Sequence, residues 1–348
     1  MESRRDLDER KGSILRALIS LYVRSGEPVG SKTLVERYRL EVSPATVRNE
    51  MGVLEDGGFI YQPHTSAGRI PTDAGYRYFV DTWTGSARLP AEQARRVRVF
   101  FGEPRWELEE ALRQTATLLS SITDHAAVVF APALDRSVIR HVELVGLTNQ
   151  RAMFVVVTDT GRVENHVISL SAPIDDVQLE QASEMLNRIA VGVALDDAVD
   201  TLKDAVDRFP LELREVVENA LGAMGRGLAD KGHNRVYLEG TSTIVDEQKF
   251  QDLESVREVI GALEHRRLLL EVLADALSAE TVSVRIGSEN SVREMQHCSV
   301  IAAPYGSPGH PIGSLGIVGP TRMDYKRTIA AVDEVAANLG RMFSDLGI

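Results

Sequence analysis

The stretch from Ser43 to Thr72, SPATVRNEMGVLEDGGFIYQPHTSAGRIPT, constrains the fold of this chain more than any other part of it. Ser43 is a typical helix N-cap residue, and Pro44 suits the first helical position because its missing N–H has no partner to lose there. Apolar residues then recur at helical spacing, which predicts an amphipathic helix with one buried face: Val47, Met51 and Leu54.

The opposite face of this helix is small and polar. It consists of Ala45, Asn49 and Gly52, with Thr46 and Arg48 on its flanks. An arginine can bind guanine O6 and N7 or a phosphate, and an asparagine can bind adenine N6 and N7. A capped amphipathic helix taken alone is more often an ordinary core helix. This face, however, lacks the Glu/Lys pairs of a solvated helix and favours contact with DNA.

A short hairpin is predicted after this helix. Gly57 and Gly58 end the helix, residues 59–61 are typical of a strand, residues 64–68 of a tight turn, and residues 69–70 of a return strand. No acidic residue occurs between Gly57 and Thr72, which suits an approach to a polyanion. Helix, glycine stop and hairpin is the order of a winged helix-turn-helix, with the hairpin as the wing.

The helices around this stretch complete the predicted motif. Residues 6–25 and 31–38 predict two preceding helices, separated by a Gly-Glu-Pro break. The start of the second could reach a phosphate. Asp73 is expected to cap a fourth helix, and residues 84–91 form a polar hinge. The residues predicted to contact DNA are Lys32, Thr33, Ser43, Pro44, Ala45, Thr46, Arg48, Asn49, His64, Thr65, Ser66 and Arg69.

Composition sets limits on partners and compartment. The 348 residues carry a net charge of −12, yet the first 84 hold equal numbers of basic and acidic side chains. DNA binding is therefore expected to depend less on overall charge than on the shape of the DNA, on contacts to bases and on two DNA-binding domains linked in one molecule. No signal region or membrane-spanning stretch is evident, and Cys298 is the single cysteine, so the expected location is the cytoplasm.

The rest of the chain predicts an α+β fold. Strand-like runs at residues 126–131, 138–147, 152–157 and 163–170 are expected to form one antiparallel sheet. Residues 175–232 and 250–277 have helical periodicity, with a strand at 236–245 between them. Strands then resume at 282–286, 298–303 and 313–318, before a closing helix at 325–346. This order indicates a β-rich domain that is interrupted by a mostly helical insertion.

Four groups of residues could suggest a catalytic, metal or cofactor site, but each is better explained by structure, so no such site is expected. The spacing of Gly313, Gly316 and Gly319 favours close packing over a phosphate loop, because strand residues lie between the glycines. Cys298 runs into an apolar strand and is expected to be a buried thiol. His141 and Glu143 lack a third metal ligand. The pair Glu289-Asn290 favours a turn or an interdomain hydrogen bond over a binding site.

Four segments together resemble the HrcA family of bacterial heat-shock repressors: residues 43–72, GYRYFVD (75–81), IGSEN (286–290) and GPTRMDY (319–325). The likeness runs from end to end, is nearly continuous over residues 43–81, and is sparse over residues 175–263. It implies a winged helix, a GAF-like domain and an inserted dimerising domain. The expected boundaries are residues 1–84 for DNA binding, 85–172 and 265–348 for the GAF-like domain, and 173–264 for the insertion.

The resemblance also implies a function and partners. These are repression of chaperone genes by a homodimer on double-stranded DNA, at an inverted-repeat operator called CIRCE, and dependence on the GroE chaperonin for activity. The recognition-helix and wing residues named above match the family's motif, whereas the dimer interface is not assigned residue by residue. The alternative is a regulator whose GAF-like domain binds a small-molecule effector, although fold does not imply function.

Overall fold

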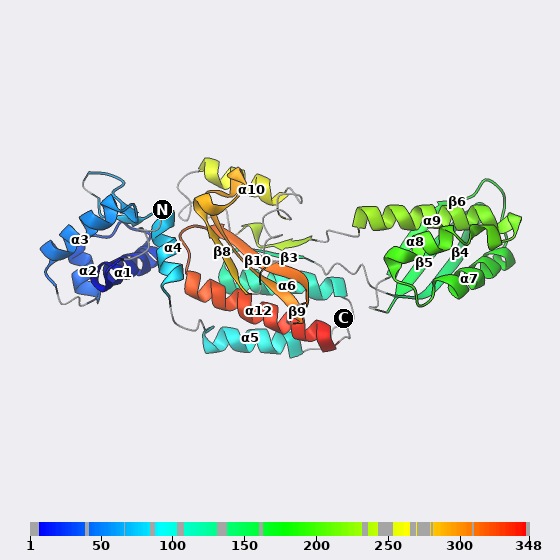
Figure 1. The fold of residues 1–348 in the computed structure, drawn as a ribbon, viewed down its shortest axis with the longest axis horizontal. Coiled ribbons are helices and arrows are strands. Elements are labelled where there is room, and N and C mark those ends of the chain that lie inside the picture. Colours follow the sequence, from blue (N-terminus) through cyan, green and yellow to red (C-terminus); the bar gives the residue numbers. More distant parts are fainter. Residues whose placement is uncertain are drawn as a thin grey trace.

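The computed structural model describes residues 7–38, 42–65, 67–83, 88–102, 108–130, 138–159, 163–231, 236–242, 253–264, 269, 279, 281–307 and 310–345. They form an N-terminal, a central and a distal unit in a row (Figure 1). The first two units share one continuous core, whereas the distal unit has a core of its own. Helices and antiparallel sheets are mixed, so the predicted α+β class is confirmed.

The N-terminal unit consists of α1 (Glu9–Ser25), α2 (Ser31–Tyr38), α3 (Pro44–Asp56), β1 (Ile60–Tyr61), β2 (Ile70–Pro71) and α4 (Asp73–Asp81). Gly26 ends α1 in the left-handed conformation, with φ of 73°. The prediction that Asp73 caps α4 was wrong by one residue. Thr72 is the cap, because its hydroxyl accepts a hydrogen bond from the backbone N–H of Gly75 at 3.2 Å.

The central unit is built on a five-stranded antiparallel sheet in the order β7-β3-β10-β9-β8. Its strands are β3 (Ala126–Phe130), β7 (Val236–Glu239), β8 (Ser283–Ile286), β9 (Cys298–Ser307) and β10 (His310–Pro320). Its helices and 3-10 turns are α5 (Ala91–Gly102), α6 (Leu108–Thr123), α10 (Leu253–Glu264), η4 (Gly287–Glu289), η5 (Arg293–Met295) and α12 (Tyr325–Asp345).

Alternation along the strands of this sheet divides the core into two layers. Ile301 and Ile317 face the layer that contains α6 and α12, while Val300 and Val318 face the layer that contains α10. Figure 1 shows α6 and α12 on one side of the sheet and α10 on the other. The helix α5 was not predicted, because it buries one residue, Val97, and so has no apolar stripe.

The distal unit contains a three-stranded antiparallel sheet and the helices that cover one of its faces. Its elements are β4 (Ile139–Thr148), β5 (Arg151–Thr158), β6 (Val163–Ser169), α7 (Asp176–Ala190), α8 (Leu195–Lys203), η1 (Val206–Arg208) and α9 (Leu211–Lys231). No helix among the described residues is long and apolar enough to cross a membrane.

The expectation of a single sheet from residue 126 to residue 170 was wrong. β3 pairs with β7 and β10, whereas β4 to β6 pair only with one another among the described strands. Phe154 and its neighbours pack on α7 to α9 rather than on the central sheet, and α10 packs on the central sheet. The inserted unit therefore spans 138–231 in this structure, where the sequence placed residues 173–264.

Two local predictions in the central unit are confirmed. A Cβ at Gly316 would lie 2.6 Å from the carbonyl oxygen of Ile301, and one at Gly319 would lie 2.7 Å from Nδ1 of His125. These glycines permit close packing within β10 and form no phosphate loop. Cys298 is fully buried, and burial raises the pKa of its thiol.

Candidate nucleic-acid interface

The helix α3 is amphipathic in the way the sequence predicts. The Ser43 hydroxyl caps it by accepting a hydrogen bond from the backbone N–H of Thr46 at 3.1 Å. The inner face is buried through Val47, Met51 and Leu54. The residues exposed along its N-terminal half are Ser43, Pro44, Ala45, Arg48 and Asn49, and Thr46 is half-buried. The predicted recognition residues therefore share one accessible surface.

Two side chains of this surface are available for binding. Arg48 and Asn49 make no hydrogen bond or ion pair with any residue that the structure describes. Glu50 lies on the inner side of α3, with Oε1 3.8 Å from Arg10 and Oε2 3.8 Å from Lys11. The helix is thus anchored on α1, while the guanidinium of Arg48 and the amide of Asn49 are free to bind a ligand.

The hairpin tip is closed by its own polar contacts. Nε2 of Gln62 donates hydrogen bonds to the carbonyl oxygens of Thr65 at 3.0 Å and Ala67 at 2.9 Å. His64 and Thr65 are exposed at this tip, as expected of a wing. Ser66, also predicted as a contact residue, lies outside the described residues. Gln62 therefore holds together the described residues on the two sides of the tip.

Arg69, which the sequence predicts as a DNA contact of the wing, is paired with a residue of α3 in the DNA-free structure. Its Nε donates to Oε2 of Glu55 at 2.9 Å, and its Nη2 lies 2.8 Å from the same oxygen. Its backbone also pairs with Val29, with N–H to O distances of 2.9 Å in both directions. The sequence predicted a wing phosphate contact, whereas the guanidinium is engaged with α3 and ties the base of the hairpin to it.

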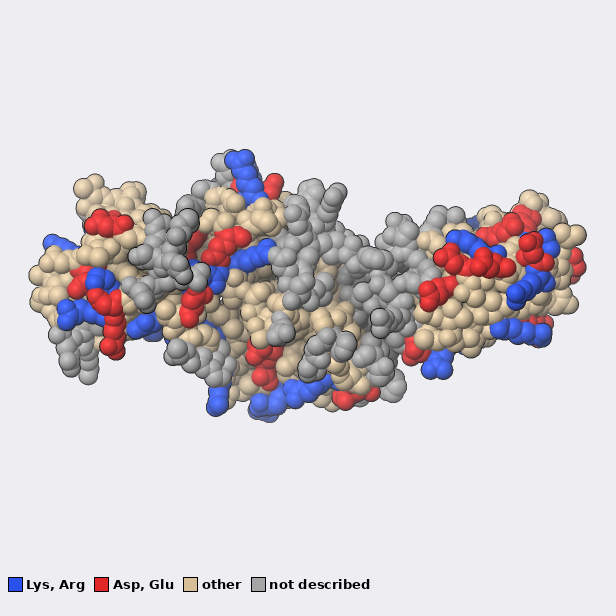
Figure 2. Space-filling view, viewed as in Figure 1, with Lys and Arg blue, Asp and Glu red and all other residues tan. Residues whose placement is uncertain are grey.

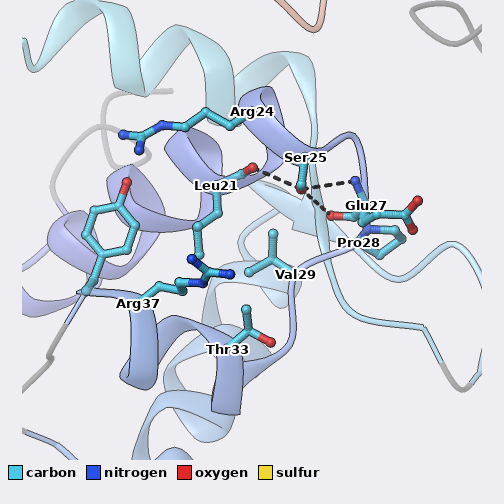
Figure 3. A pocket seen from close by; sticks show the side chains of 9 residues that line it. Leu21, Arg24, Ser25, Glu27, Pro28, Val29, Thr33 and Arg37 are labelled. Carbon is cyan, nitrogen blue, oxygen red and sulfur yellow. Dashed lines mark hydrogen bonds between the residues drawn. The ribbon is translucent and has the colours of Figure 1, made fainter.

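A cleft that the sequence did not reveal lies between α1 and α2, and its lining includes two arginines and the carboxylate of Glu27. It encloses about 630 Å³, and Figure 3 shows Arg24 and Arg37 on its walls, together with Thr33. Thr33 and Lys32 are exposed at the start of α2, and Nζ of Lys32 lies 4.0 Å from Glu36. The pattern in the sequence that could have indicated this cleft is the i, i+4 spacing of Thr33 and Arg37, which places both on one face of the helix.

Charges on the N-terminal unit are mixed. Figure 2 shows Lys and Arg side chains interspersed with Asp and Glu on the face of this unit that is in view. A mixed surface binds polyanions weakly unless specific contacts add to it. The exposed residues of α3 therefore have to supply the discrimination.

Comparison with known proteins gives a consistent result. The family model described as "HrcA protein C terminal domain" matches residues 109–329. The heat-inducible transcription repressor HrcA of Thermobifida fusca (strain YX) is 40% identical over 344 residues, which cover 99% of each chain. The repressor of the same name from Pelotomaculum thermopropionicum is 36% identical over 336 residues, 97% of each chain.

The fold is shared with a solved structure. The crystal structure of a hypothetical protein at 2.2 Å resolution has a TM-score of 0.66 to this chain at 22% identity, and the match covers 98% of this chain and 100% of that one. The relatives named above are transcription repressors and not enzymes. Similarity at this level over nearly the whole length shows that the chain belongs to the HrcA family of heat-inducible transcription repressors.

Proposed function

We propose that this repressor binds, as a cytoplasmic homodimer, to an inverted-repeat operator of the CIRCE type upstream of chaperone genes, and that it needs the GroE chaperonin to reach its active form. The observation that carries the proposal is the capped, exposed N-terminal half of α3, on which Arg48 and Asn49 have no partner among the described residues. Family membership supplies the repressor function.

In this proposal α1 to α3 and the β1–β2 hairpin form a winged helix-turn-helix. α3 enters a major groove, where Arg48 and Asn49 contact base edges. The shorter residues Ser43, Pro44, Ala45 and Thr46 allow close approach of the backbone. His64, Thr65 and Ser66 contact the DNA backbone from the wing, and Lys32 and Thr33 do so from α2. Arg69 takes a positioning role through Glu55.

The distal unit supports dimerisation by its outer sheet face. α7 to α9 cover one face, while the other carries a row in which Val145, Met153 and Val167 are direct neighbours across the three strands. Val145 is 42% exposed and Val167 52% exposed, and Val163 on the same face is 55% exposed. Contiguous exposed apolar side chains of this kind mark interaction sites, and a two-fold axis would bury this face against its copy.

A dimer with two-fold symmetry accounts for an inverted repeat. Each α3 would read one half-site, and the half-sites would be separated by whole helical turns of about 10.5 bp each. Because the first 84 residues hold equal numbers of basic and acidic side chains, one half-site alone should be bound weakly.

The topology of the central unit supports chaperonin dependence. β3 pairs with β7, and Phe130 lies opposite Val236, although the whole distal unit separates them in sequence. β3 also pairs with β10, with Val129 opposite Leu315. Such non-local pairing is slow and exposes apolar strands meanwhile. Heat would then divert chaperonin to other clients and leave less active repressor.

The central unit is proposed to be the GAF-like domain, with its sheet covered by α6 and α12. Effector binding there stays a prediction from the sequence. Two clefts among the described residues lie on the N-terminal unit, one between α1 and α2 and one beside α4.

The deciding experiment is fluorescence-anisotropy titration of the full-length protein with the CIRCE repeat, a single half-site and scrambled DNA across a salt series. Strong preference for the full repeat with a steep salt dependence is expected. Equal and weak binding to all three, persisting after refolding with GroE, would contradict the proposal. Binding restored only by the chaperonin would support both parts of it.

A further inference from the structure

The N-terminal unit is attached to the central unit by a pair of carboxylate contacts that we term the α4 clamp: Asp73, Arg77, Ser288 and Glu289. Oδ2 of Asp73 accepts hydrogen bonds from the backbone N–H of Ser288 at 2.9 Å and from its hydroxyl at 3.0 Å. In the other direction, Glu289 accepts from Arg77. Each side therefore contributes one carboxylate.

Arg77 makes the most contacts in the clamp. Its Nε donates to Oε1 of Glu289 at 2.8 Å, and its Nη2 donates to Oε2 of Glu289 and, at 2.6 Å, to the carbonyl oxygen of Val284. Nη1 lies 3.3 Å from Asp81 on the same helix. A bidentate, planar contact of this kind fixes direction as well as distance.

The central side of the clamp is held in a single shape. Oε2 of Glu289 also accepts from the backbone N–H of Ile286 at 2.9 Å, which closes the η4 turn. Gly287 has φ of 52°, and a Cβ there would lie 2.2 Å from Oδ2 of Asp73. The turn can therefore approach α4 only with glycine at this position.

Apolar contacts continue the attachment beyond the clamp. The rings of Tyr76 and Tyr325 have centroids 5.4 Å apart, and Nζ of Lys326 lies 5.1 Å from the ring centroid of Phe79 and 5.6 Å from that of Trp83. The buried core runs through this junction without a break. The attachment thus has a polar part, at Asp73 and Arg77, and an apolar part, at Tyr76 and Phe79, on adjoining faces of α4.

We propose that Arg77 is a positioning residue for operator binding. It holds Glu289 one helical turn along α4 from the place where Asp73 holds Ser288. These two contacts together fix the angle of the N-terminal unit on the central unit. Asp73 and Arg77 are four residues apart, so they lie on one face of α4. Two attachment points one turn apart prevent rotation that a single point would allow. The inference rests on the proposed function, because this angle sets the separation of the two α3 helices in a dimer.

The first test needs no DNA. Cys298 is the single cysteine and is buried, so spin labels can be placed at Glu36→Cys on α2 and Ala337→Cys on α12, both at exposed positions. Pulsed dipolar spectroscopy of the full chain should give a narrow distance distribution between these labels. Arg77→Ala should broaden or displace it, and Glu289→Gln should do so in the same direction. An unchanged distribution in both variants would overturn the proposal, whatever the protein does with DNA.

The second test compares full repeats of native and altered spacing with a single half-site. Arg77→Ala should lose on the order of tenfold in affinity for the full repeat, as expected when two linked sites lose their matched separation. The Arg77→Ala variant should also discriminate less between repeats with different half-site spacings, and its affinity for a single half-site should be unchanged. An equal loss on the half-site would overturn the positioning role, because it would place the damage within the N-terminal unit.

The control is Arg188→Ala, which removes an exposed arginine of the distal unit that lies 3.4 Å from Glu184. It should change neither the label distances nor the spacing preference. If wild-type protein shows no operator preference at all, the proposed function fails. The spectroscopic result then still decides the role of Arg77 in interdomain geometry.

Discussion

Nε of Arg69 donates a hydrogen bond to Oε2 of Glu55 at 2.9 Å, so the base of the hairpin is tied to the C-terminal half of α3. Both side chains are less than a third exposed. Gly68, beside Arg69, lies so close to the α1–α2 turn that a Cβ there would be 2.5 Å from the carbonyl carbon of Val29. The wing and the recognition helix are therefore expected to act on DNA as one rigid body.

This contact predicts the behaviour of two variants. Arg69→Ala and Glu55→Gln should each weaken binding to operator and random DNA alike, by roughly 1 kcal/mol, since each loosens the same ion pair. In a double-mutant cycle measured by anisotropy, the variant that carries both substitutions should bind DNA with about the affinity of the weaker-binding single variant, because both substitutions remove the same ion pair. If Glu55→Gln strengthened binding while Arg69→Ala weakened it, Arg69 would be a phosphate contact that Glu55 restrains.

Arg48 and Asn49 should behave differently from Arg69. Because they are proposed to contact base edges, Arg48→Ala and Asn49→Ala should each cost about 1–3 kcal/mol on the operator and relax base preference. Titration against operators with single base changes measures this. Arg188→Ala, which removes an exposed arginine 3.4 Å from Glu184 in the distal unit, is the matched control. An equal loss on operator and random DNA would refute base reading.

Ser43 allows helix capping to be separated from DNA contact. Ser43→Ala removes the hydrogen bond to Thr46 N–H and should lower the free energy of unfolding by about 1 kcal/mol. Ser43→Asp keeps a capping oxygen and should retain that stability, yet its charge should weaken DNA binding by phosphate repulsion. Thermal unfolding and anisotropy of the two variants report the two effects. DNA affinity that fell in step with stability would mean that Ser43 only caps the helix.

Local patterns were sufficient to predict much of the N-terminal unit. The Ser43 cap, the apolar spacing of α3 and the glycines at 57 and 58 act within a few residues, so the sequence records them directly. The pair Glu289-Asn290 was correctly expected to make an interdomain hydrogen bond. Its partner Arg77 was not identified, because a separation of 212 positions between Arg77 and Glu289 leaves no periodicity that links them.

The pairing of strands into sheets was the part of the fold that the sequence predicted least well. β3 and β4 to β6 have the same β-branched character, and nothing within each run indicates which sheet it joins. That choice depends on the helices that cover each sheet, such as α7 against β4. Likewise, the ion pair of Arg69 with Glu55 arises only once the hairpin folds back on α3.

The outer face of the distal sheet predicts the oligomeric state. Val145→Glu and Val167→Glu place a carboxylate in the row that a two-fold partner would bury, so each should convert the dimer to monomer, as measured by analytical ultracentrifugation. Val177→Glu, at a 61% exposed position on α7, is the matched control and should leave the dimer intact. Dimers that persist in both strand variants would place the interface elsewhere.

Burial of Cys298 predicts a pH dependence of stability. Burial raises the pKa of the folded thiol, whereas the unfolded thiol ionises near its usual pKa of about 8.5. The folded state therefore keeps a proton that the unfolded state releases, so this contribution is fully present below about pH 8.5 and is lost as pH rises. The thiol should lower the free energy of unfolding by up to about 1.4 kcal/mol per pH unit between about pH 9 and 10, in addition to the fall that buried tyrosines with raised pKa values contribute. Cys298→Ala should remove the thiol's part of this slope while shifting stability at all pH values. Denaturant unfolding of both proteins across this range measures it, and identical slopes would mean that the thiol is accessible to solvent in the folded state.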